Sequence, residues 1–198
     1  MMSKVGFVLA IAISILPNIS HAQEREDMSQ MVCTTYLAMP ADLARDYSEW
    51  ITGWHNQKSG YTTVGLDDFA RNATSVHQWC TDNGQAPIVT ALDRSFPQPG
   101  PPSGSDKIDM SLLTCRQYLT SDPERKGVIG YWMSGYFRAS TNQPVFDFVE
   151  ATGIGKAVAK YCRKHGTETV MSAIQNGPGR SQHFVPVLPP AGASTKPK

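Results

Sequence analysis

The sequence lacks the motifs that mark most enzymes and nucleic-acid-binding proteins. Charged residues make up only 18% of the 198 residues and the formal net charge is +1, so a general polyanion-binding surface is not expected. There is no nucleophile elbow, no His-Glu-x-x-His zinc motif and no complete phosphate loop, because Gly153-Ile154-Gly155-Lys156 lacks the spacing of one. We therefore expect no enzyme active site, no cofactor or metal, and no nucleic-acid partner.

Long apolar runs are also missing, except at the extreme N-terminus. There Lys4 precedes an apolar stretch of about a dozen residues, Val5 to Leu16, and a small-residue segment ends at Ala22. A charged start, a short apolar core and a small-x-small site are the parts of a secretory signal peptide, and about twelve apolar residues are too few to span a bilayer. We expect residues 1 to 22 to be removed on export, leaving no membrane contact. An uncleaved membrane anchor is the alternative.

The cysteines include no closely spaced pair of the kind that a redox motif needs. All four lie in the exported part of the chain, where an oxidising compartment favours disulfides over free thiols or a metal site. They are Cys33, Cys80, Cys115 and Cys162, and four cysteines allow three pairings. The first two are 47 residues apart and so are the last two, so a shift of 82 residues lays one pair on the other.

The same shift indicates a tandem duplication. Between residues 33 and 92, without gaps, nine of 60 positions are identical at this offset, and they are rare or structurally demanding residue types. The identical pairs are Cys33/Cys115, Tyr36/Tyr118, Leu37/Leu119, Trp50/Trp132, Gly53/Gly135, Val76/Val158, Cys80/Cys162, Gly84/Gly166 and Ala91/Ala173.

Titratable residues do not follow the duplication. The histidines at positions 55, 77, 165 and 183 have no equivalents in the other repeat. Of the neighbouring acids Asp67 and Asp68, only Asp68 has an acidic counterpart, Glu150, and a position near a helix N-terminus explains acids there without catalysis. This pattern also argues against an enzyme.

Each repeat has the periodicity of helices. No convincing alternation of period two is present, so we expect no sheet larger than a short pair of strands. The apolar residues of one helix recur at i, i+3, i+4 and i+7, which places them on one face. They are Tyr47, Trp50, Ile51 and Trp54 in the first repeat and Ile129, Trp132, Met133 and Tyr136 in the second. A later helix is expected to stop at Asn83-Gly84 in the first repeat and at His165-Gly166 in the second, with the glycine in the left-handed conformation. A short last helix is expected to follow, at residues 87–92 in the first repeat and 168–174 in the second.

The predicted fold is all-α, with two small disulfide-stabilised helical domains in tandem. The domains are expected at residues 28–94 and 110–176. Residues 95–109 contain four prolines, three serines and two glycines and are expected to be a linker, and residues 177–198 a disordered tail. Such small domains bury little core. A disulfide that closes the loop between the two cysteines of a repeat, which are 47 residues apart, would stabilise each domain by about 4 kcal/mol.

Charge divides unevenly between the two domains. Residues 28–94 hold seven acids and four Lys or Arg, giving −3, whereas residues 110–176 hold five acids and eight Lys or Arg, giving +3. One interpretation is that two solvated surfaces have diverged. The other is electrostatic complementarity, by which the domains dock on each other or face different partners.

A resemblance to a known family rests on the cysteines and aromatic residues. The second repeat carries it best, and the first repeat matches at fewer positions. The matching segments are Thr114-Cys115-Arg116-Gln117-Tyr118-Leu119, Trp132-Met133 and Tyr161-Cys162-Arg163-Lys164, with Cys33, Tyr36-Leu37, Trp50 and Trp79-Cys80 in the first repeat. This pattern resembles the HdeA/HdeB family of periplasmic acid-stress chaperones. The resemblance implies disulfides Cys33 to Cys80 and Cys115 to Cys162, and a bacterial periplasmic location.

The resemblance also implies a function. Family members resemble small helical domains that are dimeric at neutral pH and act without ATP, so we expect a chaperone that binds unfolded periplasmic proteins under acid stress. The family's dimer, the linker and the charge split favour an intramolecular pseudo-dimer of the two repeats. Without residues 1–22 the chain has 17 Asp and Glu, 17 Lys and Arg and four His, so full protonation would raise its charge from about zero to +21. That repulsion would work against the compact state.

The expected client-binding side chains are the aromatic ones of the apolar stripes, although core packing alone also explains them. They are Trp50, Trp54, Trp132 and Tyr136. Because the motif is mainly a fold signature, two other functions stay open. One is a periplasmic immunity or inhibitor protein that binds one toxin, for which the segment 130–136 is suited, and the other is a plain envelope interaction module.

Overall fold

The computed structural model describes residues 25–95 and 107–176 of the chain. The expected signal peptide, most of the expected linker and the expected tail lie outside these residues. The described part holds eight helices and four strands of three residues each, so the fold is all-α as the sequence predicts. None of its helices is both long enough and apolar enough to span a membrane.

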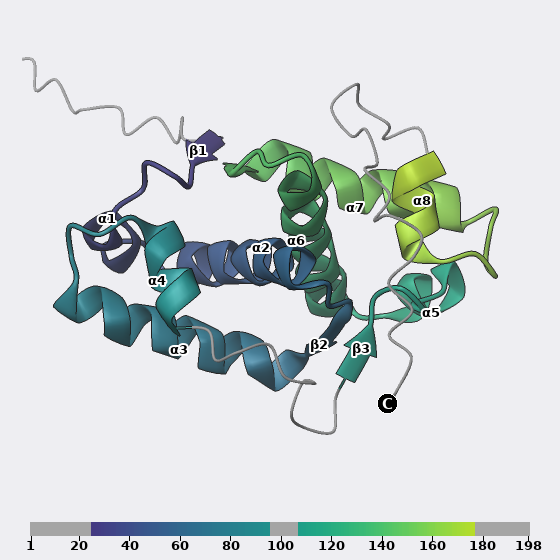
Figure 1. The fold of residues 1–198 in the computed structure, drawn as a ribbon. Helices are drawn as coiled ribbons and strands as arrows, with labels where there is room; N and C mark the ends of the chain where they lie inside the picture. The colour runs from purple at the N-terminus through teal and green to yellow at the C-terminus, as the bar shows by residue number, and fades with distance from the viewer. Residues whose placement is uncertain (1–24, 96–106, 177–198) are drawn as a thin grey trace, which may run out of the picture.

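The helices form two sets of four that repeat along the chain (Figure 1). The first set is α1 (Cys33–Leu37), α2 (Ala41–Ser59), α3 (Leu66–Asp82) and α4 (Ile88–Ser95). The second set is α5 (Cys115–Thr120), α6 (Pro123–Ser140), α7 (Phe148–Cys162) and α8 (Val170–Asn176). Each helix of the second set begins 82 residues after its counterpart, which is the offset of the predicted duplication.

Local sequence explains where several helices begin and end. Thr114 and Gln117 form a capping box at the start of α5, and the Asp122 carboxylate accepts the Arg125 N–H at the start of α6. The left-handed glycine that closes a helix is Gly60, after α2, with a φ of 75°. The expectation of the same conformation at Gly84 and Gly166 was wrong. Among the described glycines only Gly60 has a positive φ, and α3 and α7 end two to four residues before those glycines, at Asp82 and Cys162.

The strands form two antiparallel pairs, and both pairs join one repeat to the other. The strands are β1 (Arg25–Asp27), β2 (Thr63–Gly65), β3 (Lys107–Asp109) and β4 (Val145–Asp147). β1 pairs with β4 and β2 pairs with β3, and β3 and β4 lie 82 residues after β1 and β2. The two pairs are therefore equivalent under the duplication. Residues 107–109 had been expected to belong to the linker; they pair instead, because Ile108 is buried and its neighbours complete the ladder with β2.

The strands carry one apolar side chain of each repeat into the core of the other. Phe146 of β4 is 1% exposed and stacks on Tyr47 of the first repeat, with ring centroids 4.2 Å apart. Its equivalent Val64 of β2 is 2% exposed and packs in the core of the second repeat. Each core therefore contains a residue of the other repeat, and the two repeats are not independent packing units.

Two disulfides fix the helices within each repeat. Cys33 bonds to Cys80 and joins α1 to α3, and Cys115 bonds to Cys162 and joins α5 to α7. These are the two pairings that the family resemblance implies. The last short helices, α4 and α8, begin close to their expected positions and place Ile88 and Val170 in the cores at 0% exposure.

Candidate functional site

The two repeats meet where helices α2 and α6 cross at the centre of the molecule (Figure 1). The backbones touch at Gly53 on α2 and at its equivalent Gly135 on α6. A Cβ atom on Gly53 would lie 1.9 Å from the carbonyl oxygen of Trp132, and one on Gly135 would lie 1.9 Å from that of Trp50. Because backbone atoms cannot move aside independently, only glycine permits this crossing.

The predicted client-binding side chains flank this crossing. Trp50 and Trp132 are fully buried, at 1% and 0% exposure, whereas Trp54 and Tyr136 are half-buried. Trp50 stacks on Trp54 at a centroid distance of 5.4 Å, and Trp132 stacks on Tyr136 at 4.7 Å. The structure therefore brings each predicted pair together and covers its deeper member.

Both buried tryptophans lack a hydrogen-bond partner for the indole N–H. The Nε1 atoms of Trp50 and Trp132 are inaccessible, and no acceptor among the described residues reaches either. A buried unpaired donor typically costs about 1–3 kcal/mol. The crossing thus buries a large aromatic surface but leaves one unpaired indole N–H in each repeat.

Two ion pairs that join the halves of the chain run against the expected charge complementarity. They are Arg25 with Asp147, at 3.3 Å, and Arg45 with Glu124, at 3.8 Å. In both, the base belongs to the first half of the chain and the acid to the second, the reverse of the expectation. Strand pairing, the glycine crossing and exchanged core residues also hold the repeats together. The basic residues of α7, such as Lys156 and Lys160, are exposed to solvent.

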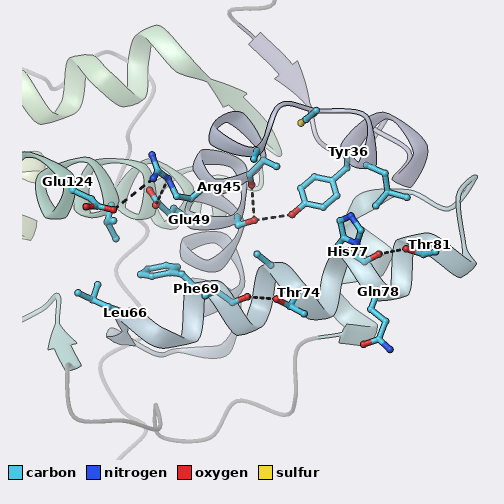
Figure 2. Close-up of a pocket in the computed structure, with 18 of the residues that line it drawn as sticks. Tyr36, Arg45, Glu49, Leu66, Phe69, Thr74, His77, Gln78, Thr81 and Glu124 are labelled. Carbon is cyan, nitrogen blue, oxygen red and sulfur yellow. Dashed lines mark hydrogen bonds and ion pairs between the residues drawn. The ribbon is translucent and has the colours of Figure 1, made fainter.

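A groove of about 1130 Å³ lies beside the crossing and belongs mainly to the first repeat. Its walls are α2 and α3, α1 closes one end and the start of α6 the other (Figure 2). The apolar part of the lining is Leu37, Met39, Ala41, Ala44, Leu66, Phe69, Ala70, Ala73 and Val128. The polar part is Tyr36, Arg45, Ser48, Glu49, Thr74, His77, Gln78, Thr81, Asp82, Asp122, Glu124 and Arg125.

Glu49 is a carboxylate on the wall of this groove with only 5% of its side chain exposed. Its pKa is raised to about 7, chiefly by burial, with the charge of Asp46 acting in the same direction and that of Arg45 opposing it. Arg45 is the nearest cation, at 3.8 Å, too far for a hydrogen bond. A buried acid with a pKa near neutrality is a common feature of binding sites, and sequence analysis did not identify it.

Among the described residues, part of the lining of this groove differs from the equivalent positions of the second repeat. The counterpart of Glu49 is Tyr131 and that of Ser48 is Gly130, where an added Cβ would make an ordinary van der Waals contact, 3.6 Å from a backbone oxygen of Ala151. The Tyr118 hydroxyl donates to the carbonyl of Gly155 on α7, whereas its counterpart Tyr36 shares a hydrogen bond with Ser48 on α2. The equivalent tyrosines therefore join α5 to α7 in the second repeat and α1 to α2 in the first.

The other residues considered from the sequence do not form a second site. Asp67 and Asp68 lie in the first turn of α3, where Asp68 pairs with Arg71. His165 pairs with Glu168 at 2.9 Å, and residues 153–156 lie within α7 rather than in a loop. In residues 25–95 and 107–176, no group of three or more His, Cys, Asp or Glu side chains is arranged to hold a metal ion.

Comparison with known proteins places these observations in one family. Neither the search of curated proteins nor the search of solved structures returns a match. The family model described as HdeA/HdeB family matches the chain twice, over residues 4–90 and 88–172. The two matches follow the same division as the two sets of helices. The chain therefore belongs to the HdeA/HdeB family and contains its domain twice in tandem.

Proposed function

We propose that this protein is an ATP-independent chaperone of the bacterial periplasm that binds unfolded proteins under acid stress. Membership of the HdeA/HdeB family supports a chaperone-like role of this kind. The two repeats would act as an intramolecular pseudo-dimer, and the expected signal peptide would direct the chain to the periplasm. No ATP site or cofactor is needed for this activity.

The observation that carries the proposal is the crossing of α2 and α6. It covers Trp50 and Trp132, the largest fully buried side chains of the two repeats, with a contact that consists of bare backbone at Gly53 and Gly135. Separation of the two helices would expose both stripes of aromatic residues at once. Such contiguous apolar surface is the kind that binds unfolded chains.

Acid would promote that separation in two ways. Positive charge would accumulate on both repeats as their carboxylates are protonated. In addition, Asp109 at the end of β3 has a lowered pKa, chiefly because it accepts a hydrogen bond from Ser111, and it also accepts one from Thr62 of the other repeat. A carboxylate with a lowered folded pKa contributes stability above its unfolded pKa, and this contribution is lost as pH falls through the folded pKa. The disulfides would keep each repeat from unfolding completely.

The experiment is light scattering of a client that aggregates at pH 2–3, with and without the protein. The proposal expects less scattering when the protein is present. Tryptophan fluorescence and a hydrophobic dye, followed from pH 7 to pH 2, report whether the aromatic stripes become exposed. An unchanged spectrum without dye binding would refute the acid-driven exposure and favour a protein that binds one folded partner at neutral pH.

A further inference from the structure

The groove beside α3 has the length and lining of a site for an extended chain. Its residues run along α3 from Leu66 to Asp82, the whole of that helix. A helix of this length spans about 25 Å, which is the length of about seven residues of extended polypeptide. An elongated, half-open groove of this kind suits a flexible chain better than a compact ligand.

The charged end of the groove holds more acidic than basic side chains. One guanidinium, that of Arg45, lies 3.8 to 3.9 Å from three carboxylates: Asp46, Glu49 and Glu124. None of the three is within hydrogen-bond distance of it. Figure 2 shows Arg45 reaching from α2 between Glu49 and Glu124, with Phe69 and Leu66 on the α3 side of the same space. The lining as a whole has four carboxylates and two arginines.

The lining of the groove differs from the equivalent positions of the second repeat. That repeat has the equivalent helices and disulfide, yet it has Tyr131 at the position of the buried acid and Gly130 at the position of Ser48. The α3 face of the groove carries small residues, Ala70 and Ala73, where a longer side chain would fill the space. The buried acid and the apolar walls occur together in the first repeat.

We propose that this groove binds an extended polypeptide segment in which a lysine or arginine is flanked by apolar side chains. The basic side chain lies beside Glu49 and Glu124 and supplies the N–H donors that Arg45 does not. The apolar neighbours lie against Phe69, Leu66 and the alanines of α3. The inference rests on the proposed function, because it specifies a class of client segment, but it concerns binding to the folded protein at neutral pH rather than after acid exposure.

The test uses fluorescence anisotropy of two labelled octapeptides with the folded, disulfide-intact protein at pH 8. One peptide alternates leucine or phenylalanine with lysine, and the other has glutamate in place of each lysine. The pH keeps Glu49 mostly ionised among its charged and titratable neighbours, which are Arg45 and Asp46 on α2, Glu124 and Tyr131 on α6, and His77 on the α3 wall. We expect the lysine peptide to bind about tenfold or more tightly than the glutamate peptide, the difference expected of a complementary charge in a partly buried site.

Two pairs of variants locate the site. Ala70→Trp fills the groove and should abolish binding, whereas Thr152→Trp at the equivalent position of the second repeat should leave it unchanged. Glu49→Gln should weaken binding of the lysine peptide about tenfold, whereas Asp67→Asn, which removes an exposed charge of α3 outside the groove, should not. Circular dichroism of each variant confirms that it is folded.

Equal affinity for the two peptides, or equal effects of the tryptophan variants, would overturn the inference. So would an unchanged affinity in Glu49→Gln. Acid protection of a client, measured on the parent protein, separates this result from the proposed function. Protection at pH 2–3 without peptide binding at pH 8 leaves the chaperone intact and removes only the neutral-pH groove site. Peptide binding at pH 8 without acid protection does the reverse.

Discussion

The buried acid Glu49 makes an unusual prediction for a protein proposed to act under acid stress: mild acidification should stabilise it. Its side chain is 5% exposed, and burial raises its pKa to about 7 from an ordinary value of 4.5. Because the folded pKa lies above the unfolded one, the folded state binds more protons between these two values. The free energy of unfolding should therefore rise as pH falls from above 7 to about 4.5, and this contribution should be constant below that.

The magnitude follows from the size of the shift. A rise from 4.5 to about 7 corresponds to about 3 kcal/mol between the two protonation states, which is a large share of the stability of a small domain. Asp46, one turn away, has a pKa raised by its own burial and acts in the same direction. Glu49→Gln should remove most of this dependence, because glutamine has the same size and does not titrate. The variant should be more stable than the parent protein at pH 8 and about equal to it at pH 5.

The assay is urea unfolding followed by tryptophan fluorescence at several pH values between 4.5 and 8.5. The informative quantity is the difference between the two pH dependences, since a constant offset from replacing the carboxylate cancels. Glu168→Gln is the matched control, because Glu168 pairs with Tyr161 and His165 near the surface and has a lowered pKa. If the parent protein and Glu49→Gln show the same slope above pH 5, the carboxylate is solvated and the reasoning fails.

Three further predictions concern the contacts between the repeats. Gly53→Ala should destabilise the protein by about 3 kcal/mol or more in thermal unfolding, because its Cβ would collide with a backbone carbonyl. The control is Gly127→Ala on an open face of α6, which should be neutral or stabilising in the same experiment. Phe146→Ala should cost about 3–5 kcal/mol and reduce the near-ultraviolet circular dichroism of the aromatic cluster in the other repeat. Asp109→Asn should lower stability at pH 7, where the carboxylate accepts its hydrogen bonds, and progressively less as the pH falls through the lowered pKa of Asp109; an equal loss at pH 7 and at low pH would exclude the titration of Asp109 as the cause.

The duplication and the helices were predictable from the sequence because their signals are periodic. Cysteine spacing and the apolar stripe at i, i+3, i+4 and i+7 each depend on several residues at fixed distances, and tertiary packing rarely overrides such patterns. The stripes containing Trp50 and Trp132 are buried as expected. The same pattern does not predict which elements cover the stripes, because it indicates only that one face of the helix is buried.

The strands were missed because each contributes so little sequence. Three residues with one buried side chain, as in Lys107–Asp109, give no alternation to detect. The residues before β3 are rich in proline and glycine and suggested a linker. The glycines of the crossing, in contrast, did leave a signal: Gly53 and Gly135 are identical under the duplication and lie within helices, where glycine costs up to about 1 kcal/mol relative to alanine. A repeated glycine at that cost indicates close backbone contact.

The groove and Glu49 could not be predicted from the repeat pattern, because they depend on residues that differ between the two repeats. The alignment that reveals the duplication draws attention to what the halves share, and Glu49 opposite Tyr131 is one of the many positions that differ. Its importance depends on the groove between α2 and α3, and the first tyrosine of each repeat also has a different hydrogen-bond partner. Tyr36 bonds to α2 and Tyr118 to α7. Because this tyrosine is identical in the two repeats, the sequence does not indicate that its hydrogen-bond partners differ.

The opposing pKa shifts impose an order on the response to acid. Protonation of Glu49 adds stability between about pH 7 and 4.5, and protonation of Asp46, whose pKa is also raised by burial, acts in the same direction. Asp109, at the β2–β3 contact between the repeats, has a lowered pKa, as does Glu168, so each loses its contribution as the pH falls through its folded pKa. Stability should therefore pass through a maximum in weak acid and fall at lower pH, where positive charge also accumulates. A switch of the proposed kind would stay closed while Glu49 is protonated in mild acid and would open at lower pH.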